Sequence, residues 1–570
     1  MSIANPSSLS ATLQALAIDR GLDSSSAAFA KQADAADPLS SLRSHYHLPL
    51  KVSAQHSAWP EGKSAPQPSS SEPAIYLCGN SLGPLPKRSK QYVIEDLDAW
   101  GTHAVLGHFN HPIGPSRQWT KIEEKPARIM SDLVGAKPSE VTICNTLTSN
   151  LHTLLATFYR PATVPDGSVA STQAATSSGD GGKVRHKILH ERSPFPSDQY
   201  ALGSVVELNG RDPDTSLVPL SPRENERVLR TEDILSKMEE EAATGECWGI
   251  LLGSTQYLTG QAFELGAIAA KARELGIFVA FDLAHAFANI PLALHDWGVD
   301  FAVWCTYKYG SSGPGGIAGM FVHEKWNQKK DLVRPSGWWG HNKATRFAMP
   351  KEFDPISGAA GWQQSNPSSL DMSAFLGSLE TLSLALEMVG TPKELVELFG
   401  TEAWATEQEA KGQLGFGSVM PLLRSKSEKL TGYLEHLLFE VPANKAVFDR
   451  LGLQLITPHD PTQRGSQLTI RVPDTSASED VQTDAAGPVT TKDAGSSDAS
   501  AGGSVAPPTA KTTMVARLQQ HIEEHYGVIA DIRNPDVIRL APLAQYNTFT
   551  DVWTAVEALK ASAQTLVGSA

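Results

Sequence analysis

The feature that most constrains the fold is a regular order of short apolar segments and one helical segment in residues 248–322. Four of these segments are strand-like, because they are short, apolar and rich in β-branched or aromatic residues. They are "WGILLGS" (248–254), "IFVAFD" (277–282), "DFAVWC" (300–305) and "GIAGMFV" (316–322). Between the first two, "FELGAIAAKARELG" (263–276) has helical apolar spacing and ends on Gly276, a good helix terminator. This order predicts an α/β domain with a mostly parallel sheet.

The chain of 570 residues is too long for a single hydrophobic core, and its pattern changes after residue 370. Beyond that point the segments predict a long amphipathic helix followed by a smaller α+β lobe. They are a helix over 369–390, "LQLIT" (453–457), "QLTIRV" (467–472), a helix over 513–526 and "VIRLAPL" (537–543). We therefore divide the chain into a partly disordered N-terminal extension (1–74), a large α/β domain (75–370) and a small C-terminal α+β domain (371–570).

Three stretches are rich in small and polar residues: 53–73, 163–184 and 474–512. Such a composition cannot bury enough apolar surface to offset chain entropy. The last two interrupt the predicted domains, and strand-like and helix-like patterns resume after each. We therefore expect both to be insertions in surface loops.

Composition excludes several classes of protein. A net charge of −14 argues against a nucleic-acid binder, which normally has a basic face. No apolar run approaches the roughly 20 residues of a membrane span. The four cysteines lie far apart, so they suggest neither a zinc site nor a disulfide framework. Residues 1–30 lack the basic patch and apolar block of a secretory signal, so we expect a cytoplasmic protein.

The residues most suited to chemistry lie at the ends of two predicted strands. Asp282 ends one strand, and Lys308 follows the next in "CTYKYGSSGPGG", where it precedes a glycine-rich turn. A lysine can form a Schiff base with an aldehyde once it has lost its proton. Pyridoxal phosphate also needs a carboxylate against its ring nitrogen, and the carboxyl ends of parallel strands bring such groups together. Each residue alone is more simply a loop lysine or a strand-end cap, so the pair carries the hypothesis.

A phosphate site is suggested by "NTLTSNLH" (145–152), which follows the strand-like "EVTIC" and begins a helical run. Free N–H groups at the helix start, with the Thr146 and Thr148 hydroxyls, would bind an anion. A simple threonine N-cap explains the segment equally well. The glycine-rich loops "GNSLGP" (79–84) and "GSSGPGG" (310–316) lack the order of a nucleotide P-loop.

Two other segments have both a functional and a structural interpretation. In "FPSD" (195–198), Phe195 could stack on a cofactor ring and Asp198 could bond beside it, although such a segment is more often a capped turn. "GWWGH" (337–341) is more often a packed core or an interface patch.

Two further chemistries are not supported. His103, His108 and His111 lie close in sequence, but no acidic or cysteine ligand accompanies them at metal-site spacing. Asp282 and His285 are similar to part of a hydrolase triad, but the chain has no G-x-S-x-G nucleophile elbow.

Taken together, these segments resemble the kynureninase family of fold-type-I pyridoxal-phosphate enzymes. The resemblance runs through nearly the whole chain, apart from the first 40 or so residues and the two insertions. Its segments are "IYLCGNSLGPLPK" (75–87), "NTLTSNLH" (145–152), "FPSD" (195–198), "YLTGQ" (257–261), "FDLAHAFANIPLALHDWGVDFAVWCTYKY" (281–309), "GGIAGMFVHEK" (315–325), "GWWGHNKATRF" (337–347), "SNP" (365–367) and "IRLAPLAQYNTF" (538–549). The 281–309 stretch is highly specific.

The resemblance implies a role for individual residues. Lys308 would be the Schiff-base lysine, Asp282 the partner of the ring nitrogen, and Tyr307 a proton donor or relay. The residues that would bind pyridoxal 5'-phosphate are Leu147, Thr148, Phe195, Pro196, Ser197, Asp198, Gly253, Asp282, His285, Tyr307, Lys308, Trp338 and Asn366. The residues that would bind substrate are Ser81, His108, Asn366 and Arg539, the last by gripping the substrate carboxylate.

The resemblance also implies a homodimer in which Trp338 and Asn366 reach the partner's cofactor. The expected reaction is hydrolysis of kynurenine or 3-hydroxykynurenine, without nucleic-acid or membrane partners and without a metal. This sequence departs from the family in three places. His108 and His111 both match the histidine that stacks on the substrate, and we prefer His108. Gly253 is Ser in some relatives, so its contact must come from backbone, and Leu258 replaces an aromatic residue.

The main rivals are a cysteine desulfurase or an aminotransferase of the same fold, and a pyridoxal-binding protein without turnover. A desulfurase requires a mobile, exposed cysteine, whereas Cys305 ends a buried strand. The joint presence of Lys308, Asp282 and Arg539 argues against the protein without turnover.

Overall fold

The structure is a computed structural model that describes residues 21–51, 71–161, 183–327, 329, 332–389, 419–474 and 513–568. Most of the three low-complexity stretches lies outside the described residues, as do residues 1–20 of the predicted N-terminal extension. None of the described helices is long and apolar enough to cross a membrane.

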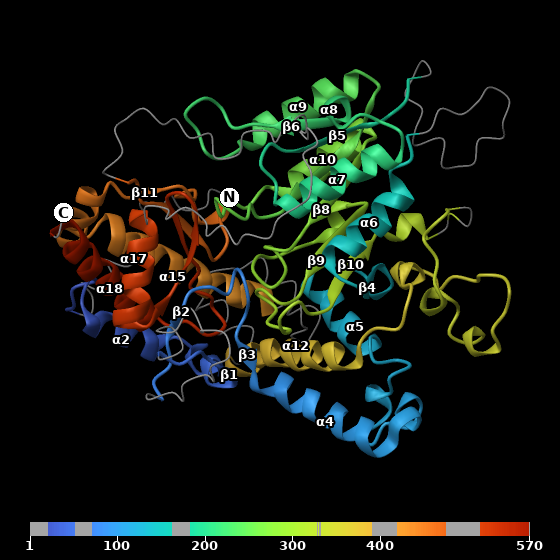
Figure 1. The fold of residues 1–570 in the computed structure, drawn as a ribbon, viewed down its shortest axis with the longest axis horizontal. Coiled ribbons are helices and arrows are strands. Elements are labelled where there is room, and N and C mark those ends of the chain that lie inside the picture. Colours follow the sequence, from blue (N-terminus) through green and yellow to red (C-terminus); the bar gives the residue numbers. More distant parts are fainter. Residues whose placement is uncertain are drawn as a thin grey trace, which may run out of the picture.

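A seven-stranded sheet forms the centre of the larger lobe (Figure 1). Its strands, in spatial order, are β4 (Val141–Ile143), β10 (Ala318–Val322), β9 (Phe301–Cys305), β8 (Phe278–Asp282), β7 (Cys247–Gly253), β5 (Lys187–Glu191) and β6 (Leu217–Leu220). The five strands from β9 to β6 are parallel, and β10 is antiparallel to both of its neighbours. The predicted mostly parallel sheet is confirmed.

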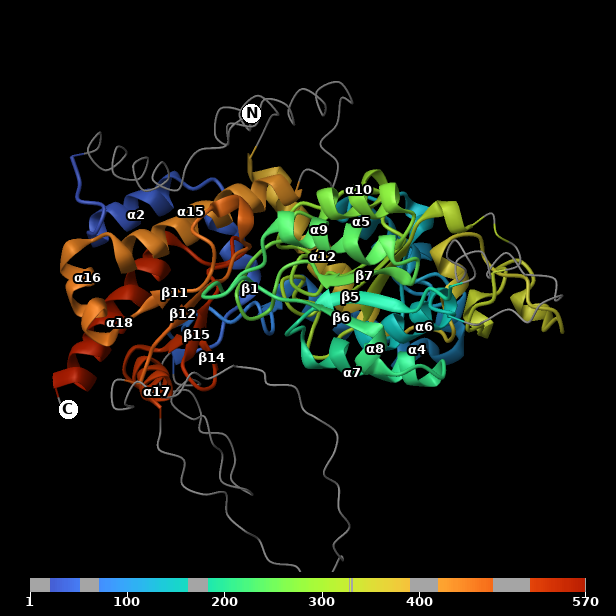
Figure 2. The same ribbon diagram turned by 90° about the horizontal axis from the view of Figure 1, so that it is seen from above.

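Helices cover both faces of this sheet, which lies between two layers in Figure 2. They are α4 (Lys87–His103), α5 (Glu124–Leu133), α6 (Leu147–Phe158), α7 (Pro196–Leu208), α8 (Pro213–Ser216), α9 (Thr231–Ala243), α10 (Leu265–Leu275), α11 (Leu294–Trp297) and α12 (Ser369–Val389). The two layers follow from the alternation of side chains along each strand. Ile250 and Leu252 of β7 pack into one hydrophobic cluster with α9 and α10. Leu251, which lies between them, packs into the opposite cluster with α6 and α7.

The smaller lobe is built on a four-stranded antiparallel sheet in the order β11 (Gln454–Leu455), β12 (Leu468–Arg471), β15 (Val537–Leu540) and β14 (Asp531–Arg533). Its helices are α2 (Ala27–Ala36), α15 (Val419–Phe439), α16 (Pro442–Phe448), α17 (Met514–Tyr526) and α18 (Phe549–Gly568). Two short ladders complete the fold: β1 (Tyr46–His47) with β3 (Leu85–Pro86), and β2 (Ile75–Tyr76) with β13 (Val528–Ile529).

Two helices, α2 and α12, pack with a different part of the chain from the one to which we assigned them. Phe29 of α2, from the segment we assigned to the extension, packs in the core of the smaller lobe with Tyr433. Phe375 of α12, from the segment we assigned to the small domain, packs in the core of the larger lobe with Phe287. In Figure 1, α12 lies beside α4 under the large sheet.

Candidate active site

A pocket lies beyond the carboxyl ends of the parallel strands, where ligands bind in such sheets. Asp282 ends β8, Glu191 ends β5, Gly253 ends β7, and Lys308 follows β9 by three residues. The residues that line the pocket are Leu147, Thr148, Glu191, Phe195, Ser197, Asp198, Gly253, Thr255, Tyr257, Asp282, Ala284, His285, Cys305, Tyr307 and Lys308. The structure therefore brings ten of the thirteen expected cofactor-binding residues into one wall.

Lys308 contacts a neutral imidazole. Its Nζ lies 3.1 Å from Nε2 of His285, whose Nδ1 lies 3.2 Å from the hydroxyl of Tyr309. Burial, followed by the positive charge of Lys308, holds the pKa of His285 well below its usual range. With its proton on Nδ1, the imidazole offers the Nε2 lone pair to the ammonium group. His285 can therefore accept a hydrogen bond from Nζ of Lys308 and hold the lysine in place.

Two buried carboxyl groups lie beside each other opposite this lysine. Burial raises the pKa of both Asp282 and Asp198, and the negative charge of Asp282 raises that of Asp198 further. The Ala284 N–H donates to Oδ1 of Asp282 over 2.7 Å and holds its orientation. In contrast, Oδ1 of Asp198 is buried without a partner. A protonated ring nitrogen could donate a hydrogen bond to this pair of carboxyl groups.

The starts of two helices meet at the other end of the pocket. Leu147 begins α6 and Pro196 begins α7, and the hydroxyls of Thr148 and Ser197 lie 2.7 Å apart across the gap. Helix N-termini carry free N–H groups and a positive partial charge, so two of them favour a phosphate. Thr146 is the N-cap residue of α6, but its side chain makes no capping hydrogen bond, and its hydroxyl lies 3.0 Å from that of Ser149.

Phe195 forms an aromatic edge of the pocket. Its ring packs at 5.4 Å and 77° against Tyr257, and Nζ of Lys308 lies 5.8 Å from its centroid. Pro196 is the expected cofactor-binding residue of this segment that does not line the pocket. It is exposed and fixes the start of α7 instead.

The glycine-rich loop with Ser81 lies close to the lysine segment. The Gly83 N–H donates to the Tyr307 carbonyl over 2.8 Å. A Cβ atom at Gly83 would clash with the Lys308 carbonyl oxygen at 2.4 Å, so a side chain cannot be accommodated there. Ser81 is exposed two residues earlier and does not line the pocket.

Arg539 does not line the pocket either, and its guanidinium group already has partners. Its Nη1 donates to the Tyr257 carbonyl over 2.6 Å, and Nη2 forms an ion pair with Asp531 of β14. Its Nε is buried without a partner. Arg539 is thus paired within the smaller lobe through Asp531, although its carbonyl partner belongs to the pocket residue Tyr257.

The remaining expected residues lie on the surface. Asn366 is exposed, and Trp338 is 42% exposed while its neighbour Trp339 is buried. A chain of edge-on ring contacts of 5.3–5.4 Å joins Trp338 to Phe347 and Phe347 to Phe109, the residue after His108. His108, Trp338 and Asn366 are all outside the set of residues that line the pocket of this chain.

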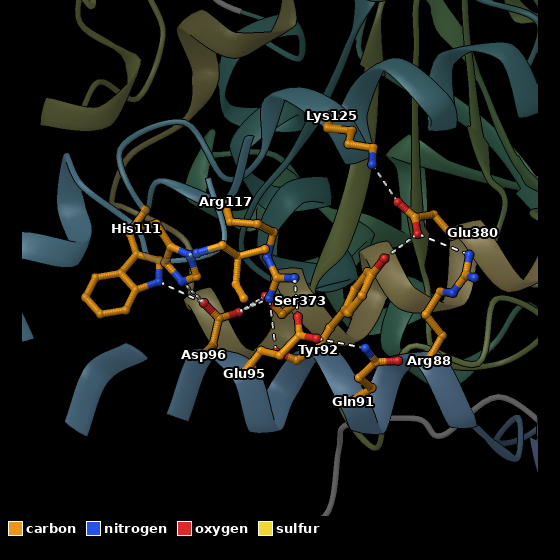
Figure 3. Close-up of polar contacts among 12 residues, drawn as sticks. Arg88, Gln91, Tyr92, Glu95, Asp96, His111, Arg117, Lys125, Ser373 and Glu380 are labelled. Atoms are coloured by element: carbon orange, nitrogen blue, oxygen red, sulfur yellow. Dashed lines mark hydrogen bonds and ion pairs between the residues drawn. The ribbon is translucent and has the colours of Figure 1, made fainter. Parts of the chain in front are cut away.

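The structure separates His108 from His111. Nε2 of His111 lies 2.9 Å from the Asp96 carboxylate, which also binds Arg117 (Figure 3). Both His111 and Asp96 are fully buried at their side chains. His108 is half-buried and packs edge-on against Trp119. His111 is therefore held by buried partners, whereas the side chain of His108 remains partly exposed.

Sequence reasoning missed five residues of the pocket wall: Glu191, Thr255, Tyr257, Ala284 and Cys305. Thr255 follows the predicted strand at 248–254 and Glu191 ends β5, so the rule that ligands bind at strand ends points to both residues. Ala284 and Cys305 lie within the 281–309 stretch, but neither residue type signals chemistry.

The donor set of the pocket fits pyridoxal phosphate. It offers a lysine beside a hydrogen-bond acceptor, a carboxyl pair with an unpaired oxygen, two helix N-termini and an aromatic edge.

Comparisons with known proteins agree with this chemistry. Residues 490–559 match the kynureninase C-terminal domain family, and residues 234–344 match the aminotransferase class-V family. Kynureninase 2 from Aspergillus clavatus is 36% identical over 551 residues, which cover 95% of this chain and 96% of the relative. Kynureninase from Myxococcus xanthus is 37% identical over 541 residues, covering 95% and 98%. Among solved structures, the cysteine desulfurase CsdA from Escherichia coli has a TM-score of 0.56 at 14% identity, covering 86% of this chain and 95% of that one. At that identity the likeness shows the fold alone.

Proposed function

The chain belongs to the kynureninase family, and from this premise we propose the reaction and the role of each site residue. The reaction is hydrolysis of L-kynurenine to anthranilate and L-alanine, and of 3-hydroxykynurenine to 3-hydroxyanthranilate and L-alanine. It belongs to tryptophan catabolism and the de novo synthesis of NAD. The observation that carries this proposal is the convergence of Lys308, Asp282 and Asp198 on one pocket at the strand ends.

Lys308 would hold pyridoxal phosphate covalently, Asp282 and Asp198 would bind its ring nitrogen, and the starts of α6 and α7 would bind its phosphate. When bound, this group withdraws electrons from the bonds around the substrate's α-carbon. Phe195 would pack against the ring. Each of these contacts orients the reacting end of the cofactor toward Lys308.

Proton movement falls to Lys308 and Tyr307. The neutral His285 accepts a hydrogen bond from Nζ of Lys308 and positions it, and the Lys308 amine would remove the α-proton of the substrate. Burial raises the pKa of Tyr307, so its phenol stays protonated. It can therefore donate a proton to the substrate carbon next to the α-carbon.

The substrate carboxylate would bind Arg539, by exchange with Asp531. An arginine suits this task because its planar group binds a carboxylate in two places. Three features support the role: the buried, unpaired Nε of Arg539, its contact with the Tyr257 carbonyl, and the place of Tyr257 in the pocket wall.

A homodimer would complete the site. Large apolar side chains are exposed at the end of α4, on the segment after it and on the segment with Trp338, an arrangement that marks interaction surfaces. They are Trp100, Val105, Leu106, Phe109, Ile113, Phe347 and Met349, and we call them the apolar patch. A second copy of the chain would cover this patch and receive Trp338 and Asn366 at its cofactor. Ring contacts through Phe347 join Trp338 to Phe109, the neighbour of His108. The subunit that supplies Trp338 and Asn366 to a site would therefore also supply His108 to it.

The domain limits and the cellular compartment are also part of this proposal. We retain a large domain over 75–370 and a small domain over 371–570, although α2 and α12 pack across these limits. A cytoplasmic location is supported by the four cysteines, all of which are free thiols in buried positions.

Incubation of the protein with L-kynurenine tests the reaction, because anthranilate is fluorescent and its release can be followed directly. The proposal expects anthranilate and alanine in equal amounts. Release of sulfide from L-cysteine without turnover of kynurenine would instead identify a desulfurase. The four buried cysteines argue against that outcome, since a desulfurase needs an exposed thiolate.

A further inference from the structure

The pocket contains a buried hydroxyl group that the proposed function leaves without a role. Two buried polar side-chain atoms of the described pocket residues lack a hydrogen-bond partner: Oδ1 of Asp198 and Oγ1 of Thr255. An unpaired buried hydroxyl is costly, so it needs a partner in the working protein. Asp198 has its proposed partner in the ring nitrogen, whereas Thr255 has none so far.

Thr255 is held by contacts of its backbone and neighbours rather than by its hydroxyl. The Gly253 N–H donates to Oε1 of Glu191 over 2.9 Å. Both the N–H and the hydroxyl of Ser254 donate to the Asp282 carbonyl, over 2.9 Å and 3.0 Å. Thr255 itself forms an antiparallel bridge with Ala262. The segment is therefore fixed, and the Thr255 hydroxyl remains available to a ligand.

Glu191 explains why the hydroxyl is at position 255 and not at 253. A Cβ atom at Gly253 would lie 2.8 Å from Oε1 of Glu191, so a side chain there would displace the carboxyl group. Ser254 does not line the pocket, so Thr255 is the next residue of this segment that does. Thr255 therefore offers the pocket a hydroxyl close to the position where Gly253 offers no side chain.

We propose that the Thr255 hydroxyl binds the ring oxygen of pyridoxal phosphate, on a segment that the Glu191 carboxyl group holds in place. The inference rests on the assignment of this pocket to the cofactor. The other polar groups of the cofactor have partners: the aldehyde has Lys308, the ring nitrogen has the two aspartates, and the phosphate has the starts of α6 and α7. The ring oxygen is the polar group of the cofactor that still lacks a partner, and the Thr255 hydroxyl is the buried group of the described pocket that still lacks one.

The charge state of Glu191 agrees with this arrangement. Burial raises its pKa to about 8, with a further contribution from Asp282, so it is mostly protonated at neutral pH. A neutral acid adds no negative charge beside an oxygen that is itself partly anionic. The Thr255 hydroxyl can thus donate to the ring oxygen without competition from a nearby carboxylate.

Reconstitution of the cofactor-free protein tests this proposal. Thr255→Val removes the hydroxyl and keeps the shape of the side chain. We expect roughly tenfold weaker binding of pyridoxal phosphate and a shifted visible absorbance maximum of the holoenzyme. Thr255→Ser should restore most of the affinity and the wild-type maximum. Glu191→Ala should weaken cofactor binding as well, because the Gly253 N–H loses its acceptor.

Thr259→Val is the matched control, because the Thr259 hydroxyl already accepts from the Gln261 N–H and does not line the pocket. It should lower the melting temperature and leave cofactor affinity and absorbance unchanged. Wild-type affinity and absorbance in Thr255→Val would overturn the role of Thr255. If the wild-type protein bound no cofactor at Lys308, the proposed function would fail instead, so the two failures are distinguishable.

Discussion

Arg539 offers the sharpest test of how substrate is held, because the structure gives it two possible roles. Its side chain is 2% exposed, and it binds the Tyr257 carbonyl and the Asp531 carboxylate. If it exchanges Asp531 for the substrate carboxylate, its loss will slow the reaction. If it only joins β15 to β14, its loss will destabilise the protein without changing kinetics in the folded fraction.

The magnitude follows from the contacts. A hydrogen bond to a charged group contributes about 1.5–3 kcal/mol, so Arg539→Ala should lower kcat/KM for kynurenine by roughly ten- to a hundredfold. Arg539→Lys keeps the charge but loses the two-point geometry, and its loss should be smaller. Neither variant should change the absorbance of the bound cofactor, because no substrate carboxylate is present in that state.

Arg539→Ala also removes the ion pair with Asp531. A lower melting temperature of this variant therefore fits either role of Arg539. Asp531→Asn removes the competing carboxylate and keeps Arg539. Under the exchange account, KM for kynurenine should fall or stay equal in this variant while the melting temperature drops. Kinetics and thermal unfolding of the three variants decide between the roles. Unstable variants with wild-type kcat/KM would refute the carboxylate role.

Three further predictions concern other parts of the structure. Asp282→Ala should bind cofactor more weakly and lose turnover, because the ring nitrogen would not stay protonated; near-normal turnover would contradict its role. The raised pKa of Glu191, about 8 against 4.5, means that its contribution to stability is complete below pH 4.5 and is lost as pH rises through about 8. The free energy of unfolding of the cofactor-free protein should fall by at most ~1.4 kcal/mol per pH unit from this group, and Glu191→Gln should remove that slope. Leu106→Asp in the apolar patch should shift the protein toward monomer in sedimentation and lower turnover, whereas an unchanged dimer would exclude the patch from the interface.

Much of the central sheet could be predicted from the sequence, because β7, β8, β9 and β10 are continuous apolar runs bounded by turns. The meeting of Asp282 and Lys308 followed from the same pattern, since adjacent parallel strands end at the same edge. These features depend on local pattern and on one rule of sheet topology.

Contacts between distant segments could not be predicted in this way. The ion pair of Arg539 with Asp531 depends on the register of β14 against β15, which no spacing in the sequence reveals. The burial of His111 depends on Asp96 from α4 and on α12, which supplies Ser373. The packing of α2 on the smaller lobe brings together residues from opposite ends of the chain, where Asp34 accepts from the Phe549 N–H over 2.6 Å.

The central claim is that the pocket around Lys308 holds pyridoxal phosphate, and reduction with sodium borohydride tests it most directly. Reduction fixes a cofactor–lysine bond, and mass spectrometry of the digested protein then locates the modified peptide. The account predicts a yellow protein whose visible absorbance is bleached, with the cofactor on the peptide that contains Lys308 and with no such adduct in Lys308→Ala. A reducible adduct that persists at the active site of Lys308→Ala, or a cofactor found on another lysine in the wild-type protein, would contradict it.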